Sequence, residues 1–282
     1  MKICEISQLM HRRLDAIYGK GEVDAIARIV MEEVLHYSIV DSILRAQNEA
    51  PEFMPGRLED IIQRLERNEP IQHILGVAVF HGHRFSVTRA TLVPRPETEQ
   101  LVDLIVDDNG QREDLRVMDV GTGSGCIAIS LARALKFAQV TAIDVSQEAL
   151  AVAQANAQAL KARVKFQRAD ILAMPLWPAH SLDILVSNPP YVCHSERANM
   201  ERNVLDYEPA NALFVPDDDP LLFYRPIVRQ AAHALADGGQ LYLEVNRRYA
   251  SDVAALITAA GLVDTRIHLD TFGNQRFVTA QR

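Results

Sequence analysis

The sequence predicts an α/β fold with a mostly parallel seven-stranded sheet, an antiparallel last strand, and a small helical bundle and a β-hairpin before it. Three observations support this prediction. Apolar residues recur at three- and four-residue spacings in the first part of the chain, as in amphipathic helices. Strand-like and helical segments alternate from Leu115 onward, which is typical of a parallel sheet covered by helices. The last two strand-like segments have no helix between them, so we expect them to pair antiparallel.

The first two parts of the chain are predicted to be a helical domain at residues 1–75 and a hairpin linker at residues 76–95. The apolar spacing from Val23 to Ala46 predicts one long helix, and residues 58–65 predict a shorter one. Residues 74–80 and 85–88 are strand-like and flank a turn at His81-Gly82-His83. A third domain is predicted at residues 96–282.

The third domain is expected to contain seven strands and the helices that connect them. A helix follows Pro96 and runs to about Val106. The strands are predicted at residues 116–120, 139–143, 164–168, 182–187, 240–245, 266–269 and 276–280. The remaining helices are predicted at residues 127–135, 147–160, 220–236 and 250–260.

The composition narrows the class of protein. The 282 residues are 48% hydrophobic and 23% charged, which is ordinary for a globular protein. A net charge of −8 argues against a protein that binds through many phosphate contacts. No apolar run is long enough to span a bilayer and no signal-peptide pattern is evident. The three cysteines form no C-x-x-C pair, so we expect reduced thiols and a cytoplasmic protein that does not bind a membrane.

A glycine-rich loop follows the first predicted strand of the sheet. It has the pattern D-x-G-x-G-x-G from Asp119 to Gly125, whereas a dinucleotide-binding loop would have its third glycine at Cys126. Asp144 ends the second strand, where a carboxylate can accept hydrogen bonds from both hydroxyls of a ribose. Asp170 follows the third strand. A tight turn without a ligand is the alternative for the glycines alone, but two acids at the same sheet edge favour ligand binding.

The glycine loop resembles the first motif of Rossmann-like S-adenosylmethionine-dependent methyltransferases. The resemblance implies that the loop contacts the amino-acid portion and the ribose of S-adenosylmethionine. It also implies that Asp170 and Ile171 border the adenine and that S-adenosylhomocysteine is the product. The residues implied in cofactor binding are Gly121, Thr122, Gly123, Ser124, Gly125, Asp144, Asp170, Ile171 and Asn188.

The segment Asn188-Pro189-Pro190-Tyr191 ends the fourth predicted strand. Residues that precede proline are held extended, so the segment is stiff. The Asn188 side-chain oxygen and the Pro189 carbonyl are two acceptors for a planar –NH2 group, and Tyr191 offers a flat wall. Two acceptors would fix a weakly nucleophilic nitrogen and stabilise the positive charge that a transferred methyl group creates on it. We therefore predict catalytic and substrate-binding roles for Asn188, Pro189, Pro190 and Tyr191.

Several longer motifs resemble the HemK/PrmC family of protein-(glutamine-N5) methyltransferases that act on peptide chain release factors. They are Pro70–Gly76, Leu92–Glu99, Asn188–Tyr191, Tyr207–Leu213, Leu243-Glu244 and Asp270–Arg276. The resemblance covers almost the whole chain and implies methylation of the glutamine in a Gly-Gly-Gln motif. It also implies that the first domain recognises the release factor and that residues 95–98 border the cofactor. Asn246, where the family usually has glycine two positions after Glu244, and Ile171, where it often has a bulkier residue, depart from its pattern.

Other interpretations remain open from the sequence. An amino-group methyltransferase acting on ribosomal RNA guanine, on DNA adenine or on another protein glutamine could carry the same tetrapeptide, although the acidic composition argues against direct nucleic-acid binding. A non-catalytic binding module is the second alternative. We expect no metal, because His81 and His83 have no Cys, Asp or Glu cluster beside them and because an N-cap at Asp219 before Pro220 explains the acidic run there. We also expect a monomer.

Overall fold

The computed structural model describes residues 1–282, and their contacts divide the chain into two compact units. Unit 1 contains Met1–Gly76 and Arg202–Tyr207. Unit 2 contains Val77–Glu201 and Glu208–Arg282. The division into a recognition domain, a linker and a catalytic domain stays a prediction about function.

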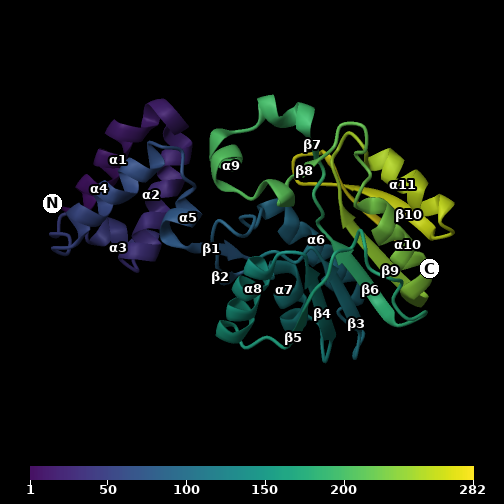
Figure 1. The fold of residues 1–282 in the computed structure, drawn as a ribbon. Coiled ribbons are helices and arrows are strands. Elements are labelled where there is room, and N and C mark those ends of the chain that lie inside the picture. Colours follow the sequence, from purple (N-terminus) through teal and green to yellow (C-terminus); the bar gives the residue numbers. More distant parts are fainter. The chain divides into compact units, whose positions relative to one another are not determined.

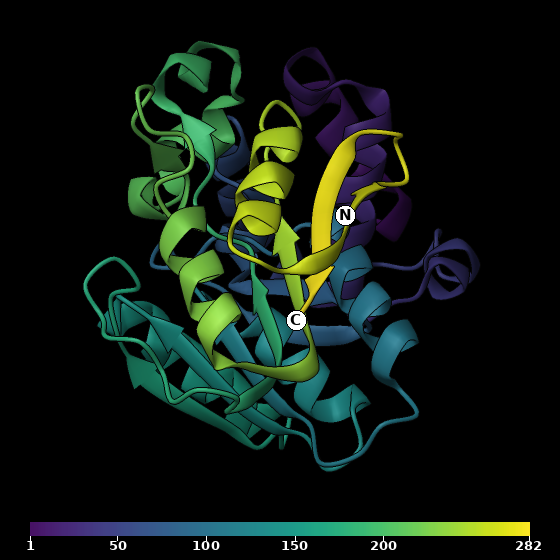
Figure 2. The same cartoon turned by 90° about the vertical axis from the view of Figure 1, so that its right-hand side faces the viewer.

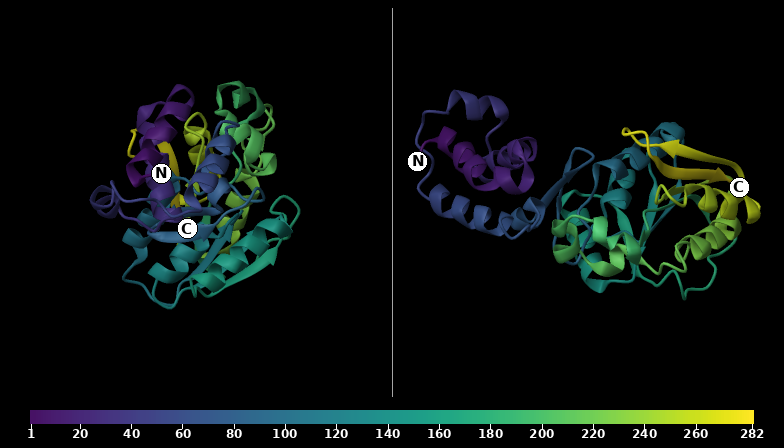
Figure 3. Two further views of the ribbon diagram at one scale, coloured as in Figure 1. Left: turned by 90° about the vertical axis from the view of Figure 1, so that its left-hand side faces the viewer. Right: turned by 90° about the horizontal axis from the view of Figure 1, so that it is seen from above.

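Unit 1 is a bundle of helices around one apolar core (Figure 3). Residues at three- and four-residue spacings supply this core, among them Ile6, Met10 and Leu14, which are fully buried. The helices that supply this core are α1 (Ile3–Tyr18), α2 (Lys20–Val34), α4 (Met54–Leu65) and α5 (Ile71–Leu75). The helices α3 (Ile39–Leu44) and α9 (Arg202–Tyr207) also belong to unit 1 and contribute no residue to this core. The predicted helical character of residues 1–75 is therefore confirmed.

The single helix predicted from Val23 to Ala46 is wrong, because α2 and α3 are separate helices. His36 has a positive φ of 56°, which a continuous right-handed helix does not allow. Ser38 then caps α3, since its Oγ accepts a 3.1 Å hydrogen bond from the Asp41 N–H. The α3 residues Ile43 and Leu44 are 69% and 77% exposed, so their apolar spacing reflects no buried helix face.

The hairpin is shorter than predicted at its start. Ile74 and Leu75 belong to α5, and Gly76 ends that helix in the left-handed region with φ 72°. The antiparallel strands are β1 (Val77–Phe80) and β2 (His83–Ser86), joined by the predicted turn. Phe80 and Phe85 are fully buried in a core of unit 2, so the hairpin packs as part of that unit.

The main sheet of unit 2 has seven strands in the order β10-β11-β9-β6-β3-β4-β5 (Figure 1). Only β11 runs antiparallel to its two neighbours. The strands are β3 (Arg116–Val120), β4 (Gln139–Asp144), β5 (Val164–Arg168), β6 (Leu182–Ser187), β9 (Leu235–Glu244), β10 (Val263–Leu269) and β11 (Gln275–Gln281). The predicted α/β fold with an antiparallel last strand is confirmed.

Helices cover both faces of this sheet because successive strand residues point to opposite sides. Val117 and Ile184 share a core with α6 (Pro96–Asn109), α7 (Cys126–Ala134) and α8 (Gln147–Ala159). Met118 and Leu185 pack with α10 (Tyr224–Ala234) and α11 (Ala250–Ala259), which lie side by side in Figure 2. The parallel strands therefore all end at one edge, where polar side chains can gather.

The segment after β6 returns to this edge through short elements. Strand β7 (Val192–Cys193) pairs in parallel with β8 (Phe214–Val215). Two 3₁₀ helices lie between them, η1 (His194–Asn199) and η2 (Ala210–Ala212). The N-cap predicted at Asp219 is wrong, because α10 begins at Tyr224 and the Asp219 carboxylate instead pairs with Arg225. None of the helices is both long and apolar enough to cross a bilayer.

Candidate functional site

A cavity of about 280 Å³ lies at the carboxyl ends of β3, β4 and β6. Ligands of open α/β sheets bind at this edge, outside the ends of the strands. The predicted site residues that line the cavity are Gly121, Gly123, Asp144, Asp170, Ile171, Asn188, Pro189 and Pro190. Residues that were not predicted complete its walls, including Ala90, Thr91, Leu92, Pro209, Asn211, Ala212 and Phe223.

The glycine loop uses its three glycines in two different ways. All three have positive φ, at 74° for Gly121, 54° for Gly123 and 83° for Gly125. An added Cβ at Gly121 or Gly123 would meet no atom within 4 Å, whereas one at Gly125 would lie 2.9 Å from Ile129 Cδ1. The first two glycines therefore leave the backbone open to a ligand. The third glycine allows the start of α7 to pack closely against Ala153 of α8.

Thr122 and Ser124 shape the loop from behind and do not line the cavity. Thr122 is buried, and its hydroxyl donates a 2.7 Å hydrogen bond to Asp119 Oδ2. The Ser124 carbonyl accepts a 2.9 Å hydrogen bond from the side chain of Asn156. The same Asn156 nitrogen donates to the Ser86 carbonyl at 3.0 Å, so one buried amide ties the loop to the hairpin. Burial raises the pKa of Asp119 to about 7.

Asp144 connects the end of β4 to the glycine loop. Its Oδ2 accepts a 2.9 Å hydrogen bond from the Gly123 N–H, and its Oδ1 accepts one of 2.9 Å from the Ser146 N–H. Each carboxylate oxygen has a further lone pair, so Asp144 can still accept hydrogen bonds from a ligand in the cavity. Asp170 is exposed and accepts from the Leu172 N–H through Oδ1, while Ile171 is 8% exposed and gives the cavity an apolar wall.

The segment 188–191 forms a corner between two cavities. Asn188 and Pro189 line both the large cavity and a smaller one of about 60 Å³. Tyr191 and Glu244 line only the smaller cavity. Leu92 and Ala212 line both cavities as well, so a group bound in the small cavity would meet a ligand of the large cavity at a boundary where Asn188 and Pro189 are the residues with free hydrogen-bond acceptors.

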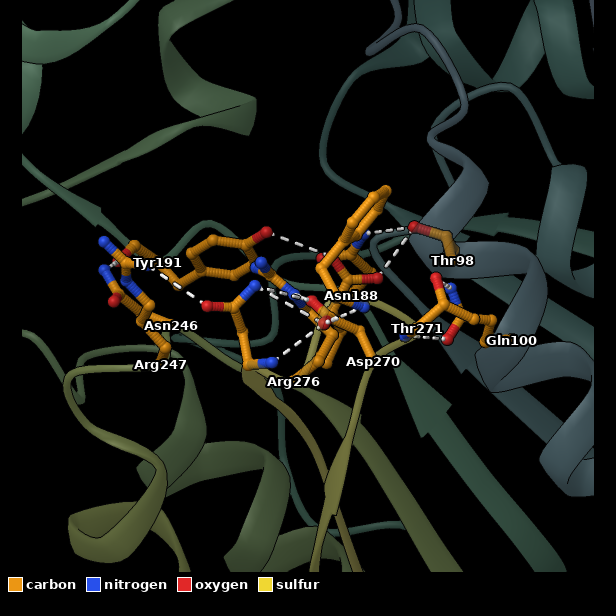
Figure 4. A network of polar contacts seen from close by, with 12 residues as sticks. Thr98, Gln100, Asn188, Tyr191, Asn246, Arg247, Asp270, Thr271 and Arg276 are labelled. Carbon is orange, nitrogen blue, oxygen red and sulfur yellow. Dashed lines mark hydrogen bonds and ion pairs between the residues drawn. The ribbon is translucent and has the colours of Figure 1, made fainter.

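A buried network of hydrogen bonds holds this corner (Figure 4). Asn188 Nδ2 donates to Thr98 Oγ1 at 3.2 Å, and the Thr98 hydroxyl donates to Glu244 Oε2 at 2.7 Å. The Tyr191 hydroxyl donates to Glu244 Oε1 at 3.0 Å. Burial raises the pKa of Tyr191 and that of Glu244.

Residues 95–98 are expected from the family resemblance to border the cofactor, but none of them lines the large cavity and Thr98 lines neither cavity. Glu244 is not among the predicted catalytic or binding residues. A signal for each is present in the sequence. Glu244 is a carboxylate at the end of a buried strand, on the same sheet edge as Asp144. Thr98 lies in the first turn of α6, just after Pro96.

An ion pair between Arg95 and Glu208 joins two segments that line the cavities. The Glu208 side chain is 1% exposed, and it accepts hydrogen bonds from Arg95 Nη2 and, at 3.3 Å, from the Val93 N–H. Burial raises the pKa of Glu208, and the charge of Arg95 opposes that shift. The pair fastens the segment with Leu92 to the segment that starts at Pro209, and both segments line the large cavity.

The fold, the glycine loop and the cavity at the strand ends define a Rossmann-like methyltransferase. A methyltransferase domain family model matches residues 117–206, and a PrmC N-terminal domain family model matches residues 6–76. A solved methyltransferase from Pyrococcus furiosus has a TM-score of 0.52 and 16% identity, over 78% of this chain and 96% of that one. This structural likeness supports the fold alone.

Curated relatives identify the family. A release factor glutamine methyltransferase from Bacteroides thetaiotaomicron is 44% identical over 98% of this chain and 99% of its own. One from Flavobacterium psychrophilum is 40% identical over 94% of both chains. The chain belongs to the release factor glutamine methyltransferase family, so the family resemblance seen in its motifs is confirmed.

Proposed function

We propose that the protein transfers the methyl group of S-adenosylmethionine to the side-chain amide nitrogen N5 of a glutamine, in the Gly-Gly-Gln motif of peptide chain release factors. S-adenosylhomocysteine is then the second product. One observation carries this proposal: Asn188 and Pro189 border both the large cavity and the small one. A methyl donor in the first cavity and a carboxamide in the second would meet at two hydrogen-bond acceptors.

The large cavity fits S-adenosylmethionine, which supplies an electrophilic methyl group on a sulfonium. The backbone at Gly121 and Gly123 has open space where other residues have a side chain. Asp144 retains acceptor capacity suited to ribose hydroxyls. Asp170 and Ile171 offer an acceptor and an apolar surface suited to an adenine. Thr122, Ser124 and Gly125 would contribute through the shape of the loop.

The small cavity suits the carboxamide of glutamine. The Asn188 side-chain oxygen and the Pro189 carbonyl would accept its two N–H groups, with Pro190 and Tyr191 completing the corner. The amide nitrogen is a poor nucleophile because its lone pair is delocalised. Two fixed acceptors hold it in position and stabilise the positive charge that develops as the new N–C bond forms. The proton leaves after methyl transfer, when the nitrogen has become acidic.

The release factor itself is the proposed partner, and residues 1–75 are proposed to recognise it. The experiment that tests the function is incubation of the protein with purified release factor and isotopically labelled S-adenosylmethionine, followed by mass spectrometry of the peptide that contains Gly-Gly-Gln. We expect one methyl group on the glutamine. RNA and DNA are incubated in parallel, and label found in nucleic acid alone would contradict the proposal.

A further inference from the structure

The carboxamide of Asn188 can face the cavities in two orientations with opposite chemistry. With its oxygen toward the substrate it accepts hydrogen bonds, and with its nitrogen toward the substrate it donates them. The two orientations have nearly the same shape, so packing alone does not choose between them. The choice must come from a hydrogen-bond partner on the far side of the group, and Thr98 is that partner, at 3.2 Å from Nδ2.

The Thr98 hydroxyl oxygen accepts a hydrogen bond from the Asn188 –NH2 group only when its own proton is donated to another group. Its hydroxyl lies 2.7 Å from Glu244 Oε2, and an ionised carboxylate can only accept. The other oxygen of Glu244 accepts from the Tyr191 hydroxyl at 3.0 Å. Both hydroxyl protons therefore point at Glu244, and the Thr98 oxygen is left with lone pairs for the Asn188 –NH2 group.

The Thr98 and Glu244 side chains of the network are almost completely removed from solvent, and they meet open space only where Glu244 lines the small cavity. Thr98 is 3% and Glu244 is 2% exposed. Burial opposes ionisation of Glu244, whereas the two hydroxyl donors and the positive charge of Arg276 favour it. Figure 4 shows Arg276 beside this network, where it pairs with Asp270 at 3.2 Å. Three separate elements thus meet at the corner: the first turn of α6, the end of β6 and the end of β9.

We propose that Glu244 and Thr98 are positioning residues that set the direction of the Asn188 carboxamide and so make the site select an amide over a carboxylate. This inference rests on the proposed function. A glutamine –NH2 group needs acceptors, and the fixed Asn188 oxygen is one of them. A glutamate carboxylate in the same place would meet only oxygens. If the Asn188 group were free to turn, its –NH2 would repel the glutamine amide hydrogens and attract a carboxylate.

The test compares Thr98→Val, which keeps the shape and removes the hydroxyl, with Thr98→Ser, which keeps the hydroxyl. Turnover of release factor is measured for each variant. Inhibition is measured with a release factor in which the motif glutamine is replaced by glutamate. For Thr98→Val we expect kcat to fall about tenfold or more, as when one preorganised group of an active site is lost. We also expect the glutamate competitor to bind several-fold more tightly, while Thr98→Ser stays near the wild type in both measurements.

Glu244→Gln is the second variant, and it leaves the Thr98 hydroxyl in place. The new amide brings an –NH2 donor, so one of the two hydroxyls must turn its proton away. We expect the same two effects at smaller size, a lower kcat and tighter binding of the glutamate competitor, because only the amide orientation with its –NH2 toward Thr98 reverses the Thr98 proton. The affinity for S-adenosylhomocysteine and the melting temperature are measured for each variant, because a general loss of structure would change these as well.

The measured preference for glutamine over glutamate distinguishes the two possible roles of Thr98. A purely structural role would not shift this preference toward glutamate. Equal kcat and equal competitor affinity in Thr98→Val and Thr98→Ser would overturn the inference. A fall in kcat with unchanged preference for glutamine would overturn it as well. Absence of glutamine methylation by the wild-type protein is a separate result, and it would contradict the proposed function instead.

Discussion

The hydroxyl of Thr122 donates a 2.7 Å hydrogen bond to Asp119, whose side chain is completely buried at the base of the glycine loop. Burial outweighs this bond and a backbone hydrogen bond from Ala128, and the pKa of Asp119 is raised to about 7. The folded protein therefore binds a proton at Asp119 between about pH 4 and pH 7, where the unfolded chain has already lost it.

Asp119→Asn is expected to change how stability depends on pH. Because the folded pKa is above the unfolded one, Asp119 makes the wild type lose stability as the pH rises from about 4 to 7, by at most about 1.4 kcal/mol per pH unit. Asparagine does not titrate, so the variant gains stability relative to the wild type across this range. Urea denaturation at several pH values measures the difference. The exposed Asp218→Asn is the control, and parallel profiles for wild type and Asp119→Asn would contradict the prediction.

Gly125→Ala is expected to destabilise the protein more than Gly261→Ala does. Both glycines have nearly the same positive φ, 83° and 85°, so both substitutions carry the same backbone cost. A Cβ at Gly125 also collides with Ile129 and approaches Ala153 Cβ to 3.1 Å, whereas one at Gly261 meets nothing within 4 Å. The collision should add about 1–3 kcal/mol in urea denaturation. Equal effects of the two substitutions would rule out the close packing of α7.

Glu208→Gln is expected to weaken both the fold and the binding of S-adenosylhomocysteine. Glu208 is buried and fastens the Leu92 segment to the Pro209 segment, so losing its charge leaves Arg95 without its partner. We expect about 1–3 kcal/mol less stability and several-fold weaker binding, measured by urea denaturation and calorimetry. The control Asp206→Asn removes an exposed ion pair with Arg202 and should change stability by less than about 1 kcal/mol. Binding that stays at the wild-type value would contradict a role for the ion pair in shaping the cavity.

Asn188→Ala is expected to remove most of the turnover and to retain cofactor affinity. The substitution deletes one of the two proposed acceptors for the substrate amide, so kcat should fall by about 10²–10³-fold. Binding of S-adenosylhomocysteine should change only a few-fold, because the glycine loop and Asp144 are untouched. Single-turnover methylation of release factor and calorimetry measure the two quantities. Asn199→Ala, at an exposed position, is the control. Turnover at the wild-type rate would refute the role of Asn188.

The strands were predictable where apolar runs end at turn residues. The bounds of β3, β5 and β6 agree with the prediction, since each run is short and has polar or turn-forming neighbours. The helix predicted from Val23 to Ala46 failed because periodicity does not distinguish a buried face from an exposed one. The apolar spacing continues through Ile43 and Leu44, but the chain turns at His36 and leaves these side chains exposed.

The sequence predicts only those site residues that lie in a single recognisable segment. The glycine loop, Asp144 and Asn188 could be recognised because each ends a strand of the same sheet. The functions of Thr98 and Glu244 could not, because their hydrogen bonds to Asn188 and Tyr191 join residues that are far apart in the sequence. Thr122 and Ser124 were predicted to bind the cofactor directly, but a loop pattern does not say which side chains turn away from the cavity.

The position of β11 between β9 and β10 determines when the sheet can be completed during synthesis of the chain. β11 pairs with β9 on one side and with β10 on the other, yet it is the last of these strands to leave the ribosome. A nascent chain that has not reached Gln275 exposes the hydrogen-bonding edge of β9 beside a nearly finished hydrophobic layer. Such an edge is a template for pairing with other chains. The seven-stranded sheet of unit 2 is therefore completed only after β11 has left the ribosome, and prematurely terminated chains should aggregate.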